Sequence, residues 1–253
     1  MTTITLLEKL YANISLKMAV SQIQASCAGL EVTIKAAEAT SSGWLRLSVS
    51  GEDEAAALNL LKKDFGVASA YAKDIKEGSI CKGKIVPIKR RGTEIHIDVG
   101  VSFPEPIIAV VSLEHLQSQL VDGKRLPLKL LSRLFCFLDN FPIEILIKRA
   151  HSERKLFAAE LSERQILLIS SWVASCLDRL VVIGAFPKTI ENALRASGHV
   201  RDIVEIESLG MLEHTIVCKL GTNAVGLIPR LGRLIPHAVF GVFSPTEILR
   251  MRA

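Results

Sequence analysis

Aromatic residues and paired cysteines are what this sequence has least of. Phe, Trp and Tyr make up only 5% of its 253 residues. A core must therefore rest on Leu, Ile, Val and Ala, and few rings are available to stack on nucleic-acid bases. The five cysteines lie tens of residues apart without a Cys-x-x-Cys pair, which argues against a zinc ribbon and against a disulfide framework. We expect no metal and no cofactor.

The sequence motifs of common enzyme classes are also missing. There is no G-x-x-x-x-G-K-[ST] or G-x-G-x-x-G loop, no G-x-S-x-G elbow and no H-E-x-x-H helix. The six histidines are scattered without ligand spacing, and His214 beside Glu213 is the nearest approach to a catalytic pair. Adjacent residues on a strand point to opposite faces, so this pair predicts no shared chemistry. We expect no enzyme activity.

Composition indicates a folded protein without a membrane span. Its 49% hydrophobic and 23% charged residues are ordinary values, and its length allows one large domain or two to three small ones. No secretory signal is evident, and the longest apolar region, residues 166–186, is interrupted by Asp178 and Arg179. We therefore expect a cytoplasmic protein. Its mild net charge of +5 permits association with RNA or with an acidic protein surface.

One stretch in the middle of the chain, residues 83–116, organises the rest. Residues 84–88 predict a strand, residues 89–92 (Lys-Arg-Arg-Gly) a hairpin tip, and residues 93–99 the returning strand. In that strand β-branched and polar residues alternate with period two, which is typical of a half-buried strand. Strand, hairpin, strand, loop, strand and short helix is the order in which a five-stranded OB barrel begins.

A family resemblance appears in the same stretch. Residues 78–116 contain G-x-I-V-x-I-x-x-x-G followed by I-D-V-G, and this pattern resembles the RNA-binding OB repeat of ribosomal protein S-one. The resemblance implies an RNA-binding barrel. The chain departs from that family in one respect, because the family exposes aromatic rings on its second and third strands. Here those positions offer His96 and, loosely, Phe103.

The same spacing recurs near the end of the chain. Ile-Val-x-Ile-x-x-x-Gly occurs at residues 85–92 and again at 203–210. Residues 214–220 and 224–228 then predict further strands, and Val239–Phe243 a closing strand. We interpret this as a second, diverged OB-like unit that arose by duplication. A chance recurrence is the alternative, because such a strand followed by Gly is common.

The fold predicted from these patterns is α+β with three parts. Residues 1–73 predict a small domain in the order strand, helix, strand, strand, helix, and residues 74–150 predict a central OB-like barrel. Residues 151–253 predict a helical segment followed by the second OB-like β unit.

Basic residues mark the candidate site. Clustered Lys and Arg bind phosphates, and the densest group lies at the predicted hairpin of residues 82–91. The alternative role of such charges is to keep strand edges soluble. We favour RNA binding for the cluster at residues 82–91 and the solubility role for the basic residues later in the chain. The predicted RNA-binding residues are Lys82, Lys84, Lys89, Arg90, Arg91, His96, Lys148, Arg149, Arg230 and Arg233.

A second resemblance concerns the whole chain. The run ALRASGHVRDIVEIESLGMLEHTIVCKLGTNAVGLIPRLGR and the acidic start Gly-Glu-Asp-Glu at residues 51–54 are similar to an archaea-restricted family of uncharacterised proteins. This resemblance implies a cytoplasmic archaeal protein and implies nothing about catalysis.

The function predicted from the sequence is that of a non-enzymatic RNA-binding factor. Phosphate-binding charge is present and stacking rings are scarce, so structured or ribosomal RNA is the expected partner. The alternative is a protein-interaction module that docks on the ribosome or RNA polymerase without direct RNA contact. Such a module could act as a homodimer.

Overall fold

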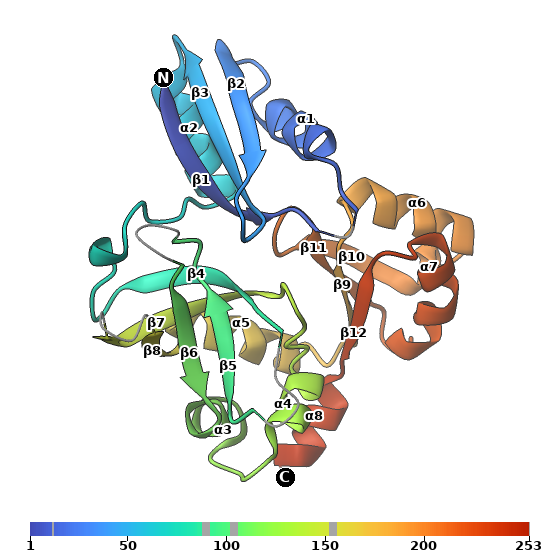
Figure 1. Cartoon of the computed structure of the whole chain (residues 1–253). Helices are drawn as coiled ribbons and strands as arrows, with labels where there is room; N and C mark the ends of the chain where they lie inside the picture. The colour runs from blue at the N-terminus through green and yellow to red at the C-terminus, as the bar shows by residue number, and fades with distance from the viewer. Residues whose placement is uncertain (12, 88–91, 102–105, 152–155, 253) are drawn as a thin grey trace.

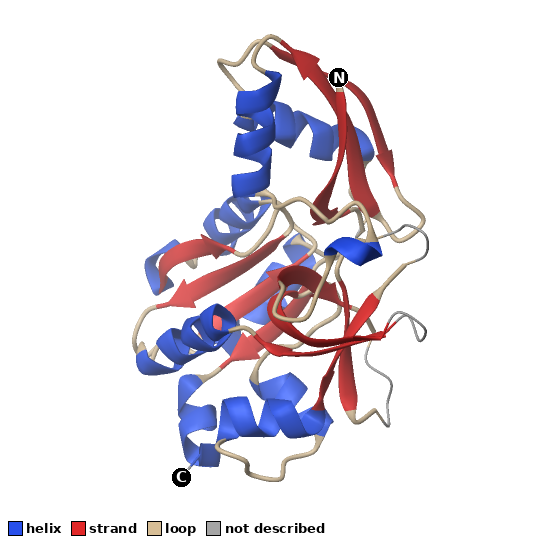
Figure 2. Cartoon of the chain, turned by 90° about the vertical axis from the view of Figure 1, so that its left-hand side faces the viewer, coloured by secondary structure: helices blue, strands red, loops and turns tan. Residues whose placement is uncertain are grey.

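The computed structural model describes residues 1–11, 13–87, 92–101, 106–151 and 156–252. The chain folds into an N-terminal sheet with two helices, a central barrel, and a second sheet with its own helices (Figure 1). Seen from the side, the N-terminal unit stands on top of the other two (Figure 2). This arrangement brings residues that are far apart in the sequence to one junction.

The N-terminal unit has the predicted order of elements. Its antiparallel sheet has the order β1-β3-β2, and β3 pairs with both neighbours. Leu6, Ile23, Leu45 and Leu61 form the centre of a core between this sheet and its two helices. The elements are β1 (Thr2–Lys9), α1 (Leu16–Ser26), β2 (Val32–Ala39), β3 (Trp44–Gly51) and α2 (Glu54–Asp64).

The central unit is a closed five-stranded barrel in the order β4-β5-β6-β8-β7. β6 and β8 run parallel, the other pairs are antiparallel, and β7 returns to β4. This closure is that of an OB barrel, so the predicted central barrel is confirmed. A short η1 (Ala72–Asp74) leads into it. Its elements are β4 (Ile80–Ile85), β5 (Glu94–Asp98), β6 (Ile108–Ser112), α3 (Leu113–Val121), α4 (Leu128–Leu134), β7 (Pro142–His151) and β8 (Leu156–Leu161).

Two local features explain the sequence pattern of the barrel. Ile95, Ile97 and Val99 are all buried, as their period of two predicts. Gly83 is required because β5 passes so close that a Cβ there would lie 2.5 Å from the carbonyl oxygen of Asp98. The barrel also extends past its predicted end at residue 150, because β8 supplies the fifth strand.

The C-terminal unit is an open sheet, and the prediction of a second OB-like β unit is wrong. Its antiparallel strands have the order β10-β11-β9-β12, and the chain order strand, helix, strand, strand, helix, strand is that of a ferredoxin-like unit. The elements are α5 (Glu163–Ala174), β9 (Arg179–Ile183), α6 (Pro187–Ser197), η3 (Val200–Asp202), β10 (Ile203–Ser208), β11 (Glu213–Cys218), η4 (Ala224–Leu227), α7 (Ile228–Leu234), β12 (Val239–Phe243) and α8 (Pro245–Arg252).

The error arose at residues 224–228, which were predicted to be a strand. Asn223 accepts a hydrogen bond from the Val225 amide through its side chain and so begins a short helix. Pro229 then occupies the first turn of α7, where its missing N–H costs nothing. The recurring Ile-Val-x-Ile spacing therefore marks a hairpin that both units contain, and the folds diverge after it.

The barrel and the C-terminal sheet share one hydrophobic core. β9 is buried on both faces: Leu180 and Val182 face α6 and α7, whereas Val181 and Ile183 join the core of the barrel. On the barrel side, the rings of Trp172 and Phe243 pack at 5.2 Å. The two units are therefore continuous in their packing.

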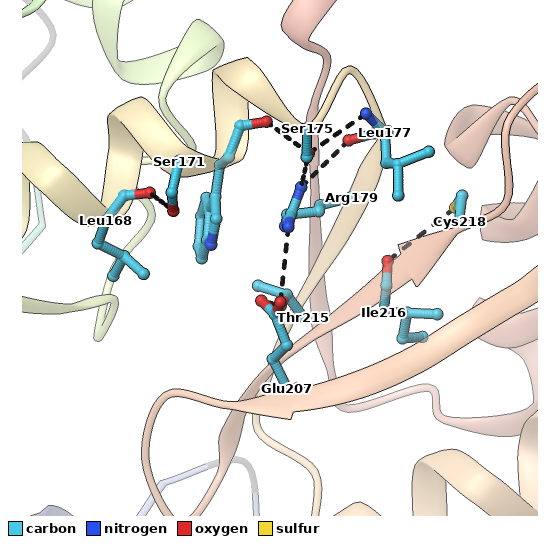
Figure 3. A network of polar contacts seen from close by, with 10 residues as sticks. Leu168, Ser171, Ser175, Leu177, Arg179, Glu207, Thr215, Ile216 and Cys218 are labelled. Atoms are coloured by element: carbon cyan, nitrogen blue, oxygen red, sulfur yellow. Dashed lines mark hydrogen bonds and ion pairs between the residues drawn. The ribbon is translucent and has the colours of Figure 1, made fainter.

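A polar network fastens α5 to the C-terminal sheet (Figure 3). The buried Arg179 donates to the Ser175 hydroxyl at 2.7 Å and to the carbonyl oxygen of Leu177 at 3.3 Å. It also faces Glu207 at 3.5 Å, and Glu207 accepts a bond from Thr215 at 3.0 Å. Both terminal nitrogens of the Arg179 guanidinium are occupied by partners within the fold, so we assign the network a structural role.

Candidate nucleic-acid interface

Lys84, one of the predicted RNA-binding residues, is not on the surface. Its side chain is 2% exposed, and its Nζ atom donates to Glu8 Oε2 at 2.9 Å and to Glu213 Oε1 at 2.7 Å. The prediction that Lys84 binds RNA is therefore wrong, because a phosphate could reach it only after both carboxylates had moved.

The residues around Lys84 come from all three units. Glu8 lies on β1, Lys84 on β4 and Glu213 on β11. The Tyr11 hydroxyl donates to Glu213 as well, and the Met211 amide donates to Glu8 at 3.0 Å. We call Glu8, Tyr11, Lys84 and Glu213 the Lys84 cluster, and it ties the N-terminal unit to both others.

A second buried ion pair lies on the same side of the N-terminal unit. Lys9 Nζ contacts Asp98 Oδ2 at 2.7 Å and lies over the ring of Trp44, 4.5 Å from its centre. The other Asp98 oxygen accepts the Gly100 amide at 3.0 Å. Asp98 of the I-D-V-G motif therefore has a structural role at this junction.

The pKa values of three groups in the Lys84 cluster are perturbed, and burial together with Glu213 raises the pKa of Tyr11 above its usual value. Burial raises the pKa of Glu8 from 4.5 to about 7, although Lys84 acts in the opposite direction. Burial alone would lower the pKa of Lys84, but Glu8 and Glu213 outweigh it, so the pKa of Lys84 lies above its usual value. Lys84 therefore stays charged at neutral pH, and Glu8 is the group that titrates.

This shift predicts a pH-dependent contribution to stability. A carboxyl group whose pKa is higher in the folded state contributes stability below about 4.5 that is lost as the pH rises to about 7. We expect wild type to lose on the order of 3 kcal/mol relative to Glu8→Gln over that range. Urea unfolding of both proteins at several pH values measures the difference. The exposed Glu205→Gln is the control, and parallel profiles for wild type and Glu8→Gln would refute the assignment.

A cleft of about 520 Å³ lies where the three units meet. Its walls come from α1, α2, β4, the start of β7, α5 and the turn between β10 and β11. Lys82 and Arg164 both line it, both are exposed, and neither side chain has a partner in the described part of the chain. Volumes of this size at domain interfaces are typical of binding sites.

His214 and Glu213 serve different surroundings, as their adjacency on a strand predicts. His214 is fully buried, lines the cleft, and has Nε2 3.3 Å from the carbonyl oxygen of Met211. Burial lowers the pKa of His214, so it is neutral near pH 7 and adds no positive charge to the cleft.

Three of the predicted residues share the outward face of β4 and β7. Lys82 lies opposite Glu144, and Ile80 lies opposite Leu146 in the next outward row. Lys148 and Arg149 follow at the far end of β7, both exposed, and Lys148 contacts Glu160 at 3.1 Å. We call Lys82, Lys148, Arg149 and the neighbouring Arg164 the β7 basic row.

The other predicted residues lie elsewhere. His96, on β5, is half-buried and has Nε2 2.8 Å from Glu94 Oε1. Arg230 and Arg233 lie on α7, where they bond to the carbonyl oxygens of Ser197 and Pro229. The hairpin tip, Lys89, Arg90 and Arg91, lies outside the described residues, as does Phe103.

Sequence reasoning missed Arg164 and the acids of the Lys84 cluster. Arg164 follows Ser162, whose side chain caps α5 by accepting the Gln165 amide. The Ser162-x-x-Gln165 spacing of a capping box was a usable signal, because it places Arg164 at an exposed helix start. For Glu8 and Glu213 the signal was a charged residue at a position where a strand is otherwise buried.

Two family models match this chain. The DUF2110 N-terminal domain matches residues 3–70 and the DUF2110 C-terminal domain matches residues 177–243. Together they cover more than half of the sequence. The chain belongs to the DUF2110 family. The matched segments correspond to the β1–α2 unit and to the β9–β12 sheet, so in this DUF2110 protein the Lys84 cluster joins both family domains to the barrel between them.

Other comparisons add little to the family assignment. The intact alpha subunit of aIF2 from Pyrococcus abyssi is 9% identical, with 70% of this chain and 98% of that chain covered and a TM-score of 0.27. Similarity at that level does not establish a common fold or function. A search of curated proteins found no match. The predicted restriction of the family to archaea and the resemblance to S-one stay predictions.

Within the described ranges, no helix combines the length and apolar character that crossing a bilayer requires. His, Cys, Asp and Glu side chains of the same ranges form no group suited to a metal ion.

Proposed function

We propose that this protein is a non-enzymatic RNA-binding factor of the cytoplasm that contacts the phosphate backbone of structured RNA, ribosomal RNA being the expected target. The observation that carries the proposal is the β7 basic row on a barrel of OB topology. Lys82, Arg149 and Arg164 are exposed cations without a partner among the described side chains. Unpaired Lys and Arg on such a surface gain counterion release when they contact phosphates.

The surface chemistry favours backbone contacts over base stacking. Between Lys82 and Lys148 the outward side chains are the aliphatic Ile80 and Leu146. No outward position on the described barrel strands carries Phe, Tyr or Trp, and the imidazole of His96 is engaged by Glu94. Lys82 and Lys148 are separated by about 13 Å along the strand direction, a span that suits a few consecutive phosphates.

Charge reversal on the β7 basic row tests this proposal. The variant Lys82→Glu/Arg149→Glu/Arg164→Glu removes three phosphate contacts, each worth about 0.7 in the log–log salt slope. We expect the slope to fall by about 2, and affinity near 0.1 M salt to fall by about a hundredfold. Binding of ribosomal RNA and of a short oligonucleotide, followed by fluorescence anisotropy across a salt series, measures both.

The matched control changes the same amount of charge elsewhere. Lys35, Lys62 and Lys188 are exposed and unpaired within the described chain, so Lys35→Glu/Lys62→Glu/Lys188→Glu shifts the net charge equally. An equal loss of affinity in both variants would show a non-specific charge effect and would refute the β7 basic row as the site.

A second candidate function is docking on the ribosome or RNA polymerase without RNA contact. One observation favours it: Leu167 and Leu168 on α5 are 61% and 37% exposed beside the cleft. Apolar docking responds little to salt, so a flat salt series favours this alternative. Sedimentation of native lysate with and without ribonuclease separates the two, because RNA-dependent co-migration with a ribosomal subunit is lost on digestion.

A further inference from the structure

Positive charge is concentrated at one end of the molecule. Residues 121–133 and 245–252 contain six Lys and Arg against two carboxylates, a balance of +4, whereas the whole chain carries +5. These segments are the end of α3, the following turn, α4 and α8, which lie together beneath the barrel (Figure 1). We call their cations the basic cap: Lys124, Arg125, Lys129, Arg133, Arg250 and Arg252.

Specific contacts hold the three helices of the cap together. Arg252 donates from Nε and Nη2 to the carbonyl oxygen of Leu120, at 2.9 and 2.6 Å, and so joins α8 to the end of α3. Arg133 lies 3.9 Å from Glu247, which joins α4 to α8. Leu120, Leu131 and Ile248 are buried in the core of the barrel. The cap is therefore mounted on rigid elements, which limits the entropy lost on binding.

Four cations of the basic cap are accessible to a ligand. Lys124, Arg125, Lys129 and Arg250 are exposed, and none has an ion pair or side-chain hydrogen bond in the ranges that the structure describes. Lys129 and Arg133 are four residues apart on α4, so both point from the same face of that helix. Free cations on a fixed surface form a positive field that attracts a polyanion.

The composition of the surface identifies the kind of polyanion. Among the described residues of these segments, Leu249 is the one large apolar side chain that is exposed, at 46%. A protein interface is expected to have an apolar centre, and a membrane-binding helix an apolar face, and one Leu supplies neither. A phosphate backbone needs only cations. We infer that the basic cap is a second RNA-binding surface, which contacts the phosphates of the same structured RNA that the β7 basic row binds.

The inference rests on the proposed function but can fail separately from it. The variant Lys124→Glu/Lys129→Glu/Arg250→Glu alters unpaired side chains, so folding is preserved. On ribosomal RNA, which can span both surfaces, we expect the affinity to fall by about a hundredfold near 0.1 M salt and the salt slope to fall by about 2. On an oligonucleotide of about eight nucleotides, which occupies only the β7 basic row, we expect no change beyond that of the charge-matched control.

Each outcome decides between the two ideas. Loss of ribosomal RNA binding beyond that of the Lys35/Lys62/Lys188 control supports the cap. Full binding by the cap variant, with loss in the β7 variant, overturns the cap and leaves the proposed function standing. If neither variant differs from the control, both are wrong. Cap-dependent binding of wild type to anionic phospholipid vesicles, with unchanged RNA binding, would also overturn the inference and assign the cap to a membrane surface.

Discussion

Replacing Lys84 by alanine is expected to lower the free energy of unfolding by about 3–5 kcal/mol. The change leaves Glu8 and Glu213 facing each other at 4% and 0% exposure without a cation. Breaking a buried ion pair from one side strands a charge, and the cost of that charge exceeds what the pair itself contributes. Urea unfolding monitored by circular dichroism at neutral pH measures the loss.

The chain supplies a close control two residues earlier. Lys82 lies on the same strand and is exposed, so Lys82→Ala should change stability by no more than about 0.5 kcal/mol. The variant Glu8→Leu/Tyr11→Phe/Lys84→Met/Glu213→Leu, which also removes the hydroxyl that donates to Glu213, should recover most of the stability lost in Lys84→Ala, because apolar replacement of a complete buried cluster is often neutral. If Lys84→Ala and Lys82→Ala unfold alike, the Lys84 cluster does not hold the junction.

The second large effect is expected at Gly210, in the turn between β10 and β11. A Cβ at this position would lie 2.2 Å from Glu213 Oε2 and 3.3 Å from Glu8 Oε1. Those oxygens cannot withdraw freely, because Lys84, Tyr11 and the Met211 amide hold both carboxylates. We expect Gly210→Ala to cost about 1–3 kcal/mol through overpacking, measured by thermal and urea unfolding.

Gly226 provides the comparison for this substitution. It lies in the same unit, its φ angle is not positive, and a Cβ there would meet nothing within 4 Å. Gly226→Ala should therefore be close to neutral. A Gly210→Ala protein with the stability of Gly226→Ala would mean that the turn relaxes, and that the carboxylates of the Lys84 cluster are not fixed in place.

The barrel could be predicted from the sequence because its signal is local. Ile95 and Ile97 alternate with Glu94 and His96, and the structure buries the first pair and leaves the second pair outward. The C-terminal sheet could not be assigned in the same way. Its hairpin resembles that of the barrel, and the strand order that separates an open sheet from a barrel depends on pairings between distant segments such as β9 and β12.

The candidate site shows the same division between local and distant information. Exposure of Lys82 and Lys148 follows from their outward positions on amphipathic strands. Lys84 lies two residues from Lys82 on β4 and points to the same side of the strand. It is buried only because Glu8 and Glu213, 76 and 129 residues away in the sequence, pack against it. A charge cluster in the sequence therefore predicts a basic surface correctly only where no other unit covers it.

The position of the Lys84 cluster restricts how this protein can be divided or recombined. Its charges come from the beginning, the middle and the last third of the sequence. A cut between any two units therefore leaves charged side chains of the cluster exposed on the fragments without their partners. A chimera of two relatives keeps the junction balanced only if acid, lysine and acid are inherited as a set. A mixed set places an unpaired charge in a dry interface. The three positions are thus expected to change together or not at all, although no two of them lie in the same unit.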